Sequence, residues 1–423
     1  MNRRVFIACA SAAAVSPLVA GAGSAANVRL RFGVMTDTHA TRDPKSFERV
    51  DLAFKVFKKR GCDIFCHVGD LAEMCDPEAH RMWSEAVERA YPEGAPRAAY
   101  AYAAHDYYNY QGKRWKLTRE EIMQGYESFR KNAKLPNGMY AEFDVNGYPF
   151  VVTPQHVSEK DFEEMIVRAE KKHAQGPIFV FHHVAPENTT FNSSDWGCWW
   201  LPRLYARHPR VVVFCGHTHG SLANERNIWQ GGFTVVDVGC LAGWASSLPG
   251  GQTKVKQSYE VLVCDVLKDR IVMHRVDVRD GADIREPWVV PLPFDPATAP
   301  YALERRRASA PKVEFAEGAA LEVDVKSDPE SVTLSFPAAE KADDVFCYRI
   351  EAAKRGVLLE WETIAREDVY GEFYLRPHER TGRLKCVIKR SSLNKSRPCR
   401  FTVTPVGFYG QSGRPLEKRL ILR

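Results

Sequence analysis

Apolar and polar positions divide the chain into two regions with different periodicities. Up to about residue 285, apolar runs of strand length alternate with segments in which apolar residues recur every three or four positions, as on one face of a helix. The helical segments are 46–60, 77–90, 118–134 and 158–173. The strand-like runs are 28–35, 62–68, 97–104, 177–181 and 211–215, with a hairpin over 139–152 and further strands at 233–238, 259–266 and 270–278. This alternation predicts an α/β domain over residues 27–288.

The pattern changes after Trp288. Residues 289–312 are rich in Pro and Ala and are predicted to form a linker. From 313 to 423 only short alternating runs remain, which predicts a separate all-β sandwich. Its end, Arg400 to Pro405 followed by Tyr409 and Gly410, resembles the last strands of a fibronectin type III domain.

The first 26 residues predict an export signal. Arg3 and Arg4 precede an apolar, Ala-rich stretch, and small residues at 24–26 offer a cleavage site. The start also resembles a twin-arginine signal. We therefore expect a periplasmic or secreted bacterial protein whose mature chain begins near Asn27. An uncleaved membrane anchor is the alternative, and no later segment is long and apolar enough to span a bilayer.

Composition narrows the class of protein. The chain has 423 residues, of which 45% are hydrophobic and 26% charged, which excludes wholesale disorder and fibrous repeats. The formal net charge is +6, and Arg3 and Arg4 account for two of these charges. Because no long run of Lys or Arg follows, nucleic acid is not expected to be the main partner.

Ionisable side chains follow five of the predicted strands, at the point where each strand ends. The clusters are Asp37 with His39, Gly69 with Asp70, His105 with Asp106, His182 with His183, and His217 with His219. Carboxylate oxygen and imidazole nitrogen together suit Zn, Mn or Fe better than Ca or Mg. One Asp can bridge two ions, and two ions about 3.5–4 Å apart clamp the attacking and leaving oxygens of a phosphoryl transfer. Any one cluster alone would more often be a strand-ending turn or a buried core histidine.

In this order the clusters resemble the motifs of the calcineurin-like metallophosphoesterases, and the resemblance covers about residues 28–285. It implies a metallophosphoesterase-type β-sandwich flanked by helices. It also implies a metal-dependent phosphoric ester hydrolase, in which a metal-bound hydroxide attacks a small phosphomonoester or phosphodiester. The implied cofactors are two divalent ions (Mn, Fe or Zn).

The same resemblance implies a role for each cluster. The implied metal ligands are Asp37, His39 and His219 for one ion, Asp70 as the bridge, and His182 and His217 for the other. His105 would be the catalytic histidine near the leaving group, with Asp106 orienting it. His183 is the weaker candidate of its pair because the family places the ligand first, although an exchange of the two stays open.

Two positions depart from the family. Its third motif is Gly-Asn-His-Asp, but the Asn that completes the second metal's shell is Ala104 here. This predicts a weaker second site, and a degenerate domain that only binds a ligand or phosphate is the alternative function. The purple branch of the family has a Tyr ligand three residues after the bridging Asp, where this chain has Glu73. A purple, iron-containing site is therefore disfavoured.

Aromatic residues follow two of the clusters. Tyr108 and Trp196 are candidates to stack on a base or sugar of the substrate, and packing of loops onto the core is the competing interpretation. Nothing in residues 313–423 predicts catalysis. That domain is expected to contact a surface or a glycan, to dock onto the first domain, or to act as a spacer. A third hypothesis makes the whole protein an adhesion or scaffold module.

Overall fold

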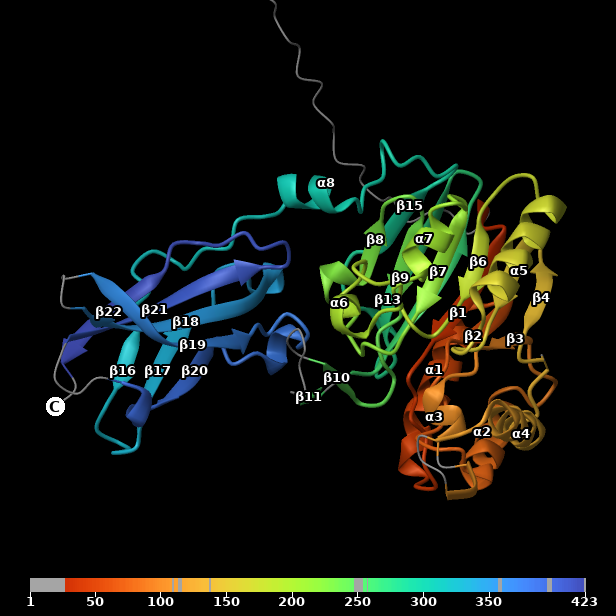
Figure 1. Cartoon of the computed structure of the whole chain (residues 1–423), viewed down its shortest axis with the longest axis horizontal. Coiled ribbons are helices and arrows are strands. Elements are labelled where there is room, and N and C mark those ends of the chain that lie inside the picture. Colours follow the sequence, from red (N-terminus) through yellow and green to blue (C-terminus); the bar gives the residue numbers. More distant parts are fainter. Residues whose placement is uncertain are drawn as a thin grey trace, which may run out of the picture.

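The computed structural model describes residues 27–108, 110–112, 116–136, 138–246, 254–256, 258–356, 360–393 and 398–421. Two domains lie side by side, one with two sheets flanked by helices and one of β-strands (Figure 1). The predicted fold class is confirmed for both. Residues 1–26, on which the export prediction rests, lie outside the described residues.

The first sheet of the larger domain has the strand order β14-β13-β12-β1-β2-β3, with β15 paired to β13. Its strands are β1 (Leu30–Met35), β2 (Ile64–His67), β3 (Arg97–Tyr100), β12 (Glu260–Val266), β13 (Arg270–Asp277), β14 (Ala282–Asp283) and β15 (Trp288–Pro291). β1, β2 and β3 are parallel to one another. Their carboxyl ends therefore meet at one edge of the sheet.

The second sheet has the order β4-β5-β6-β7-β9-β8. Its strands are β4 (Ala141–Val145), β5 (Tyr148–Val152), β6 (Ile178–Phe181), β7 (Val211–Cys215), β8 (Ile228–Gln230) and β9 (Thr234–Asp237). β5, β6, β7 and β9 run parallel. β4 and β5 form the predicted hairpin, which turns at Asn146 and Gly147. β10 (Trp244–Ser246) and β11 (Lys254–Lys256) form a separate small hairpin.

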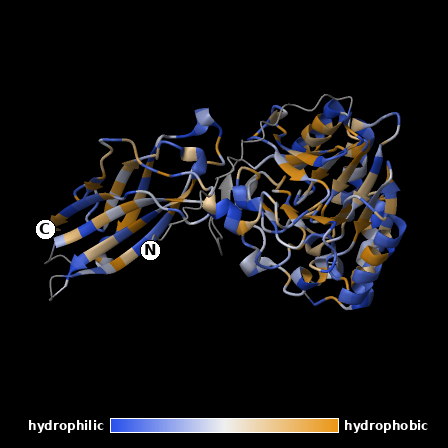
Figure 2. Cartoon of the chain, turned by 90° about the horizontal axis from the view of Figure 1, so that it is seen from above, coloured by the Kyte–Doolittle hydropathy of each residue, from blue (hydrophilic) through white to orange (hydrophobic). Residues whose placement is uncertain are grey.

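The two sheets pack face to face over an aromatic core. Phe32 on β1 lies 4.9–5.6 Å, ring centre to ring centre, from Phe150, Phe179 and Phe214 of the other sheet. All four side chains are fully buried. Alternate residues of a strand point to opposite faces, so one set fills this core and the next faces the helices. Figure 2 shows the resulting contrast between apolar strands and polar outer helices.

Helices cover the outer faces of both sheets (Figure 1). The helices are α1 (Lys45–Arg60), α2 (Pro77–Ala90), α3 (Ala104–Tyr107), α4 (Arg119–Asn132), α5 (Glu159–Lys172), α6 (Ser193–Trp196), α7 (Leu201–Tyr205) and α8 (Leu303–Ala308). Short 3-10 turns occupy Tyr110–Gly112, Glu225–Asn227, Ala342–Asp344, Pro377–Glu379 and Arg390–Ser392. A capping box of Thr118 and Glu121 begins α4. No helix among the described residues is long and apolar enough to cross a membrane.

The C-terminal domain is a sandwich of two antiparallel sheets, ordered β16-β17-β20 and β19-β18-β21-β22. Its strands are β16 (Glu322–Asp324), β17 (Ser331–Pro337), β18 (Val345–Arg355), β19 (Trp361–Tyr370), β20 (Arg383–Lys389), β21 (Pro398–Gly407) and β22 (Leu416–Ile421). β19 and β22 lie at the edges of their sheet and carry many charged residues. Their missing apolar alternation is why the sequence pattern did not predict them.

The predicted linker is partly structured. Residues 289–291 belong to β15, and α8 lies within the remainder. Tyr301 packs into the core between the sheets of the first domain, and its hydroxyl accepts a hydrogen bond from the Val289 amide (2.7 Å). The segment up to about residue 301 is therefore attached to the first domain. The ten cysteines of the described residues are all free thiols.

The two domains meet through a buried ion cluster and an apolar patch. Glu225 lies 2.8 Å from Arg275 and 2.6 Å from Arg306, while Tyr409 of the C-terminal domain donates to the Glu225 carbonyl (2.9 Å). The apolar patch joins side chains of both domains, among them Phe191 and Phe346. The C-terminal domain is thus anchored to the segment that follows His219.

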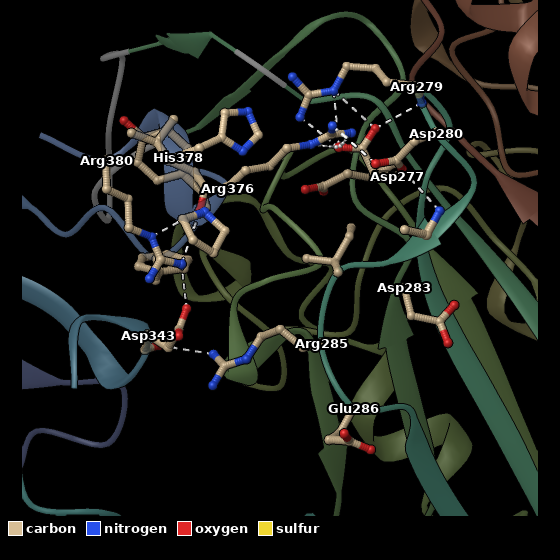
Figure 3. Close-up of a pocket in the computed structure, with 17 residues that line it drawn as sticks. Asp277, Arg279, Asp280, Asp283, Arg285, Glu286, Asp343, Arg376, His378 and Arg380 are labelled. Atoms are coloured by element: carbon tan, nitrogen blue, oxygen red, sulfur yellow. Dashed lines mark hydrogen bonds and ion pairs between the residues drawn. The ribbon is translucent and has the colours of Figure 1, made fainter. Parts of the chain in front are cut away.

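A polar cleft of about 480 Å³ opens between the domains (Figure 3). Some of its charged residues are paired across the interface: Asp277 holds Arg376 at 2.8 Å, and Arg279 reaches Glu379 at 3.2 Å. None of the predicted metal ligands lines this cleft. It is therefore a separate feature from the site at the strand ends.

Candidate metal centre

Five of the ionisable residues at the strand ends have an unusual backbone conformation. Asp37, His39, Asp70, His217 and His219 all have φ between 47° and 71°. Side chains other than glycine enter this left-handed region rarely, at a cost of about 1–3 kcal/mol each. The surrounding loops hold these residues in strained positions, and such strain clusters at functional sites.

Two glycines make the close approach of these loops feasible. A Cβ on Gly216 would lie 2.3 Å from both the Asp37 carboxylate and the Thr36 hydroxyl. Gly69 has φ of 102°, and a Cβ there would come within 2.8 Å of the His183 ring. The glycines of the second and fifth clusters therefore serve packing as well as turning.

The first group of ligand atoms comprises Asp37, His39 and His219. Asp37 Oδ1 lies 2.9 Å from His219 Nε2 and 3.7 Å from His39 Nε2. The other carboxylate oxygen of Asp37 accepts hydrogen bonds from the Thr36 hydroxyl (2.9 Å) and the His217 amide (3.0 Å). These bonds fix the carboxylate so that Oδ1 points at the two imidazoles.

The second group comprises Asp70, His183 and His217. Asp70 Oδ2 lies 3.1 Å from His183 Nε2 and 4.0 Å from His39 Nε2 of the first group. His183 Nε2 is in turn 3.8 Å from Asp37 Oδ1. The Asp70 carboxylate therefore stands between the two groups, as the bridging role requires.

The arrangement of atoms in these groups fits bound cations. His39 Nε2 and His219 Nε2 face each other at 3.2 Å, close enough to share one proton or to bind one cation together. Asp37 Oδ1 and His183 Nε2 are buried and make no hydrogen bond of good geometry among the described residues. Carboxylate and imidazole donors suit Mn, Fe or Zn.

The carboxylates of the centre raise the pKa of two of its imidazoles. Burial alone would lower the pKa of His39, but the nearby carboxylates of Asp37 and Glu73 raise it to about 10. Burial also opposes protonation of His183, yet the carboxylates of Asp70 and Asp37 raise its pKa to about 9. Burial would raise the pKa of Asp37, whereas the histidines hold it well below the usual range.

The far nitrogen of three of these imidazoles has its own partner. Nδ1 of His39 contacts Glu73 Oε2 (2.7 Å), and Nδ1 of His183 contacts the Val68 carbonyl (2.8 Å). Nδ1 of His219 contacts the Cys240 sulfur (3.3 Å). Such partners fix the tautomer and turn Nε2 toward a metal.

The structure places His183, not His182, in the second group. His182 Nδ1 hydrogen-bonds the Thr153 hydroxyl (3.0 Å), and its ring packs on Phe162 of α5. Consecutive residues of extended backbone point to opposite faces, so only one of the pair can reach the strand-end centre. The prediction of His182 as the ligand was therefore wrong in this geometry, and the alternative of His183 takes its place.

His105 lies beside the first group, with its ring 4.6 Å from the His39 ring. Its amide donates to Asp70 Oδ1 (3.0 Å), and its Nδ1 lies 2.9 Å from the Glu73 carbonyl oxygen. Because a carbonyl only accepts, Nδ1 carries the proton and Nε2 is the atom left for chemistry.

Asp106 does not orient His105, contrary to its predicted role. Its carboxylate instead accepts hydrogen bonds from the amides of Asp70 (3.1 Å), Leu71 (2.8 Å), Ala72 (3.2 Å) and Ala103 (3.0 Å). The side chain sits at the start of the short helix α3 and points back at the loop after β2. Asp106 thus shapes the loop that presents Asp70.

Ala104 is buried and supplies no ligand atom, as the sequence indicated. Its amide donates to the side-chain oxygen of Gln155 (2.9 Å). The carboxylate and imidazole side chains of the second group are therefore those of Asp70, His183 and His217.

The two aromatic candidates lie against the centre. The Tyr108 ring is 4.9 Å from the His105 ring, and the Trp196 ring is 5.9 Å from the His217 ring. Both are partly exposed. They border the two groups from different segments, which fits either a substrate contact or the packing of loops.

Glu73 is the residue that sequence reasoning missed as a participant. Its carboxylate lies within 4.8 Å of ligand atoms of both His39 and His105. A neutral imidazole has a single lone pair, so His39 can offer Nε2 to the first group only while Nδ1 keeps its proton for Glu73. The place of Glu73, three residues after Asp70, was the available signal.

One family model matches the part of the chain that holds most of this site. Residues 30–221 match the family model described as calcineurin-like phosphoesterase. A dimetal phosphatase from Danio rerio is similar in structure, with a TM-score of 0.41 and 10% identity over 63% of this chain and 99% of that one. A purple acid phosphatase from yellow lupin seeds has a TM-score of 0.43 and 12% identity over 62% and 53%. A search of curated proteins finds no match.

Proposed function

Residues 30–221 match as a calcineurin-like phosphoesterase domain, and we propose that this domain hydrolyses a small phosphomonoester or phosphodiester with two divalent metal ions. The carrying observation is the position of Asp70, whose Oδ2 lies 3.1 Å from one group and 4.0 Å from the other. A shared carboxylate between two sets of imidazoles is the arrangement that a two-ion phosphoryl transfer needs.

The proposed division of the ligands follows the geometry. Asp37, His39 and His219 would hold one ion, His183 and His217 would hold the other, and Asp70 would serve both. Bound divalent ions lower the pKa of water and neutralise the charge on phosphoryl oxygens. The chain's own residues fix where these ions sit, because hydrogen bonds set the far side of three of the imidazoles.

His105 is proposed to act on the leaving group. Its Nδ1 is tied to the Glu73 carbonyl, so a protonated ring presents Nε2–H toward the centre. That proton passes to the ester oxygen as the P–O bond breaks, and the leaving alcohol departs neutral. Tyr108 and Trp196 flank the reacting group and would stack on a flat or sugar-like part of the substrate.

The test is hydrolysis of aryl phosphate monoesters and diesters by the purified full-length chain, with Mn²⁺, Zn²⁺ or Fe²⁺ added in turn. We expect turnover with at least one metal, and a fall of about 10²–10⁴-fold in His105→Ala. Lys134→Ala, far from the centre and exposed, is the matched control. No hydrolysis of any ester with any metal would overturn the proposal.

Ala104 supports one competing function, a domain that binds phosphate or another ligand without turning it over. That function predicts that the wild-type chain binds phosphate without hydrolysing any ester. It also predicts that His105→Ala leaves phosphate binding unchanged. Reproducible turnover that disappears in His105→Ala would exclude it.

We also propose that the protein is exported, on the strength of residues 1–26 alone. Fractionation of the native bacterium should find the chain outside the cytoplasm and shortened to about residue 27. Recovery of the full-length chain from the cytoplasm would contradict this.

A further inference from the structure

Glu73 contacts two functional histidines through two different parts of the residue. Its carboxylate lies 2.7 Å from Nδ1 of His39, and its main-chain carbonyl lies 2.9 Å from Nδ1 of His105. The other carboxylate oxygen is 3.8 Å from the same atom of His105.

The backbone of this segment is fixed independently of the Glu73 side chain. The Glu73 amide donates to the Ala40 carbonyl (2.9 Å), and Ala40 and Ala72 form a parallel bridge. The loop after β2 is therefore bound to the loop after β1 by main-chain contacts. Truncation of the Glu73 side chain should leave the carbonyl that holds His105 in place.

We infer that Glu73 is a positioning residue of the proposed metal centre, whose carboxylate orients His39 and strengthens its binding of a divalent ion. An imidazole that donates Nδ1–H to a carboxylate presents Nε2 in a fixed direction and is a more basic ligand. The Nδ1 atoms of His183 and His219 have weaker partners, the Val68 carbonyl and the Cys240 sulfur respectively. The inference rests on the proposed function, because it needs His39 to be a ligand.

Because the Glu73 side chain contacts His39 and the Glu73 main chain contacts His105, a change of the side chain alone should separate the two contacts. Loss of the carboxylate should weaken the first ion's binding and leave the contact that fixes His105 intact. The effect on hydrolysis should therefore appear as a higher metal requirement, with kcat at saturating metal close to the wild-type value.

The experiment measures Mn²⁺ affinity of the full-length chain by equilibrium dialysis for the wild type, Glu73→Ala and Glu73→Gln. Removal of such a partner typically lowers metal affinity about 10- to 100-fold. We expect that loss in Glu73→Ala and a smaller loss in Glu73→Gln, because Gln keeps an acceptor oxygen. Glu170→Ala is the matched control, since Glu170 holds His208 Nδ1 at 2.9 Å on the outer side of the second sheet.

Glu73→Ala that binds Mn²⁺ within about threefold of wild type, as Glu170→Ala should, would overturn the inference and leave the proposed function standing. A wild-type chain that binds no Mn²⁺ would instead overturn the proposed function. In that event NMR of the metal-free protein, with ¹⁵N-labelled histidine, decides the positioning role. A His39 Nδ1–H signal that is slow to exchange and is lost in Glu73→Ala supports it, and one unchanged by the variant refutes it.

Discussion

Two regions of this molecule bury carboxylates, and different partners neutralise the carboxylate charge in each region. At the domain interface, Glu225 lies within 2.6–3.5 Å of the guanidinium groups of Arg275, Arg285 and Arg306. At the strand ends, Asp37 and Asp70 face imidazoles at 2.9–4.0 Å. Arginine stays charged at every ordinary pH, so the first cluster is complete without any added ion.

The imidazoles of the second cluster can be neutral or protonated, and a neutral imidazole is also a metal ligand. On the proposed function, a cation that can be bound and released would complete that cluster. The partner of a buried carboxylate thus distinguishes a structural ion cluster from a candidate site for metal chemistry. Backbone strain marks the same difference between the two clusters. The five residues with positive φ at the metal centre include Asp37 and Asp70, whereas Glu225 is not among the residues with positive φ.

Asp70→Asn should have the largest effect, and this effect should be on turnover and not on stability. The change weakens the shared ligand, so turnover should fall on the order of 10³-fold, which corresponds to about 4 kcal/mol of transition-state stabilisation. The free energy of unfolding without metal should change little. The measurement is hydrolysis of aryl phosphates beside urea unfolding, and a variant with wild-type turnover would break the comparison.

Glu225→Gln should do the opposite. It leaves three arginines without their carboxylate, and removal of one partner of a buried ion cluster costs about 3 kcal/mol of stability. Turnover of the folded protein should stay within about threefold of wild type. Glu142→Gln is the control, because its exposed pair with Arg168 contributes less than about 1 kcal/mol. Equal losses of stability in both variants would contradict the role given to the interface cluster.

The pH dependence of stability should distinguish wild type from Glu225→Gln. Burial raises the pKa of Glu225, but the three arginines outweigh it and lower the pKa to about 2 from an ordinary value of 4.5. A lowered pKa contributes stability above pH 4.5, about 3 kcal/mol here, which is lost as the pH falls toward 2. Urea unfolding at pH 6, 4 and 3 should show the gap between the two proteins shrinking. A gap that stays constant would count against this assignment.

His217→Gly should give the smallest effect on stability and raise it. Glycine relieves the cost of φ at 71°, less its own greater freedom in the unfolded chain, for a net gain of roughly 0.5–1 kcal/mol without metal. Lys134→Gly, at φ of 52°, should gain a similar amount. Only His217→Gly should also lose Mn²⁺ binding. Loss of stability in His217→Gly with a gain in Lys134→Gly would show that the centre is not strained.

Much of this fold could be predicted from the pattern of the sequence. The predicted bounds of α2 equal the observed bounds, and those of α1, α4 and α5 differ from the observed bounds by at most two residues at each end. These helices could be predicted because their apolar residues recur on one face. The edge strands β19 and β22 were missed, since a strand with an exposed face and many charges lacks the alternation that predicts it. Packing of β15 and Tyr301 onto the first domain depends on tertiary contacts that composition does not show.

The candidate site was predicted in outline and misjudged in two details. Clusters at strand ends were brought together because parallel strands end at one edge. The choice between His182 and His183 depends on which neighbour faces that edge, and one residue of register decides it. Asp106 was expected to orient His105, and Glu73 was given no role, because loop geometry sets the partner of a carboxylate and sequence spacing does not give that geometry.

The most direct measurement of the central claim is electron paramagnetic resonance of the full-length chain loaded with Mn²⁺. If Asp70 joins two sites, ions about 3.5–4 Å apart interact magnetically. At two equivalents the six-line signal of isolated Mn²⁺ should give way to the spectrum of a coupled pair, and Asp70→Asn should restore the isolated signal or abolish binding. Two bound but uncoupled ions, or no bound Mn²⁺ at all, would contradict the account.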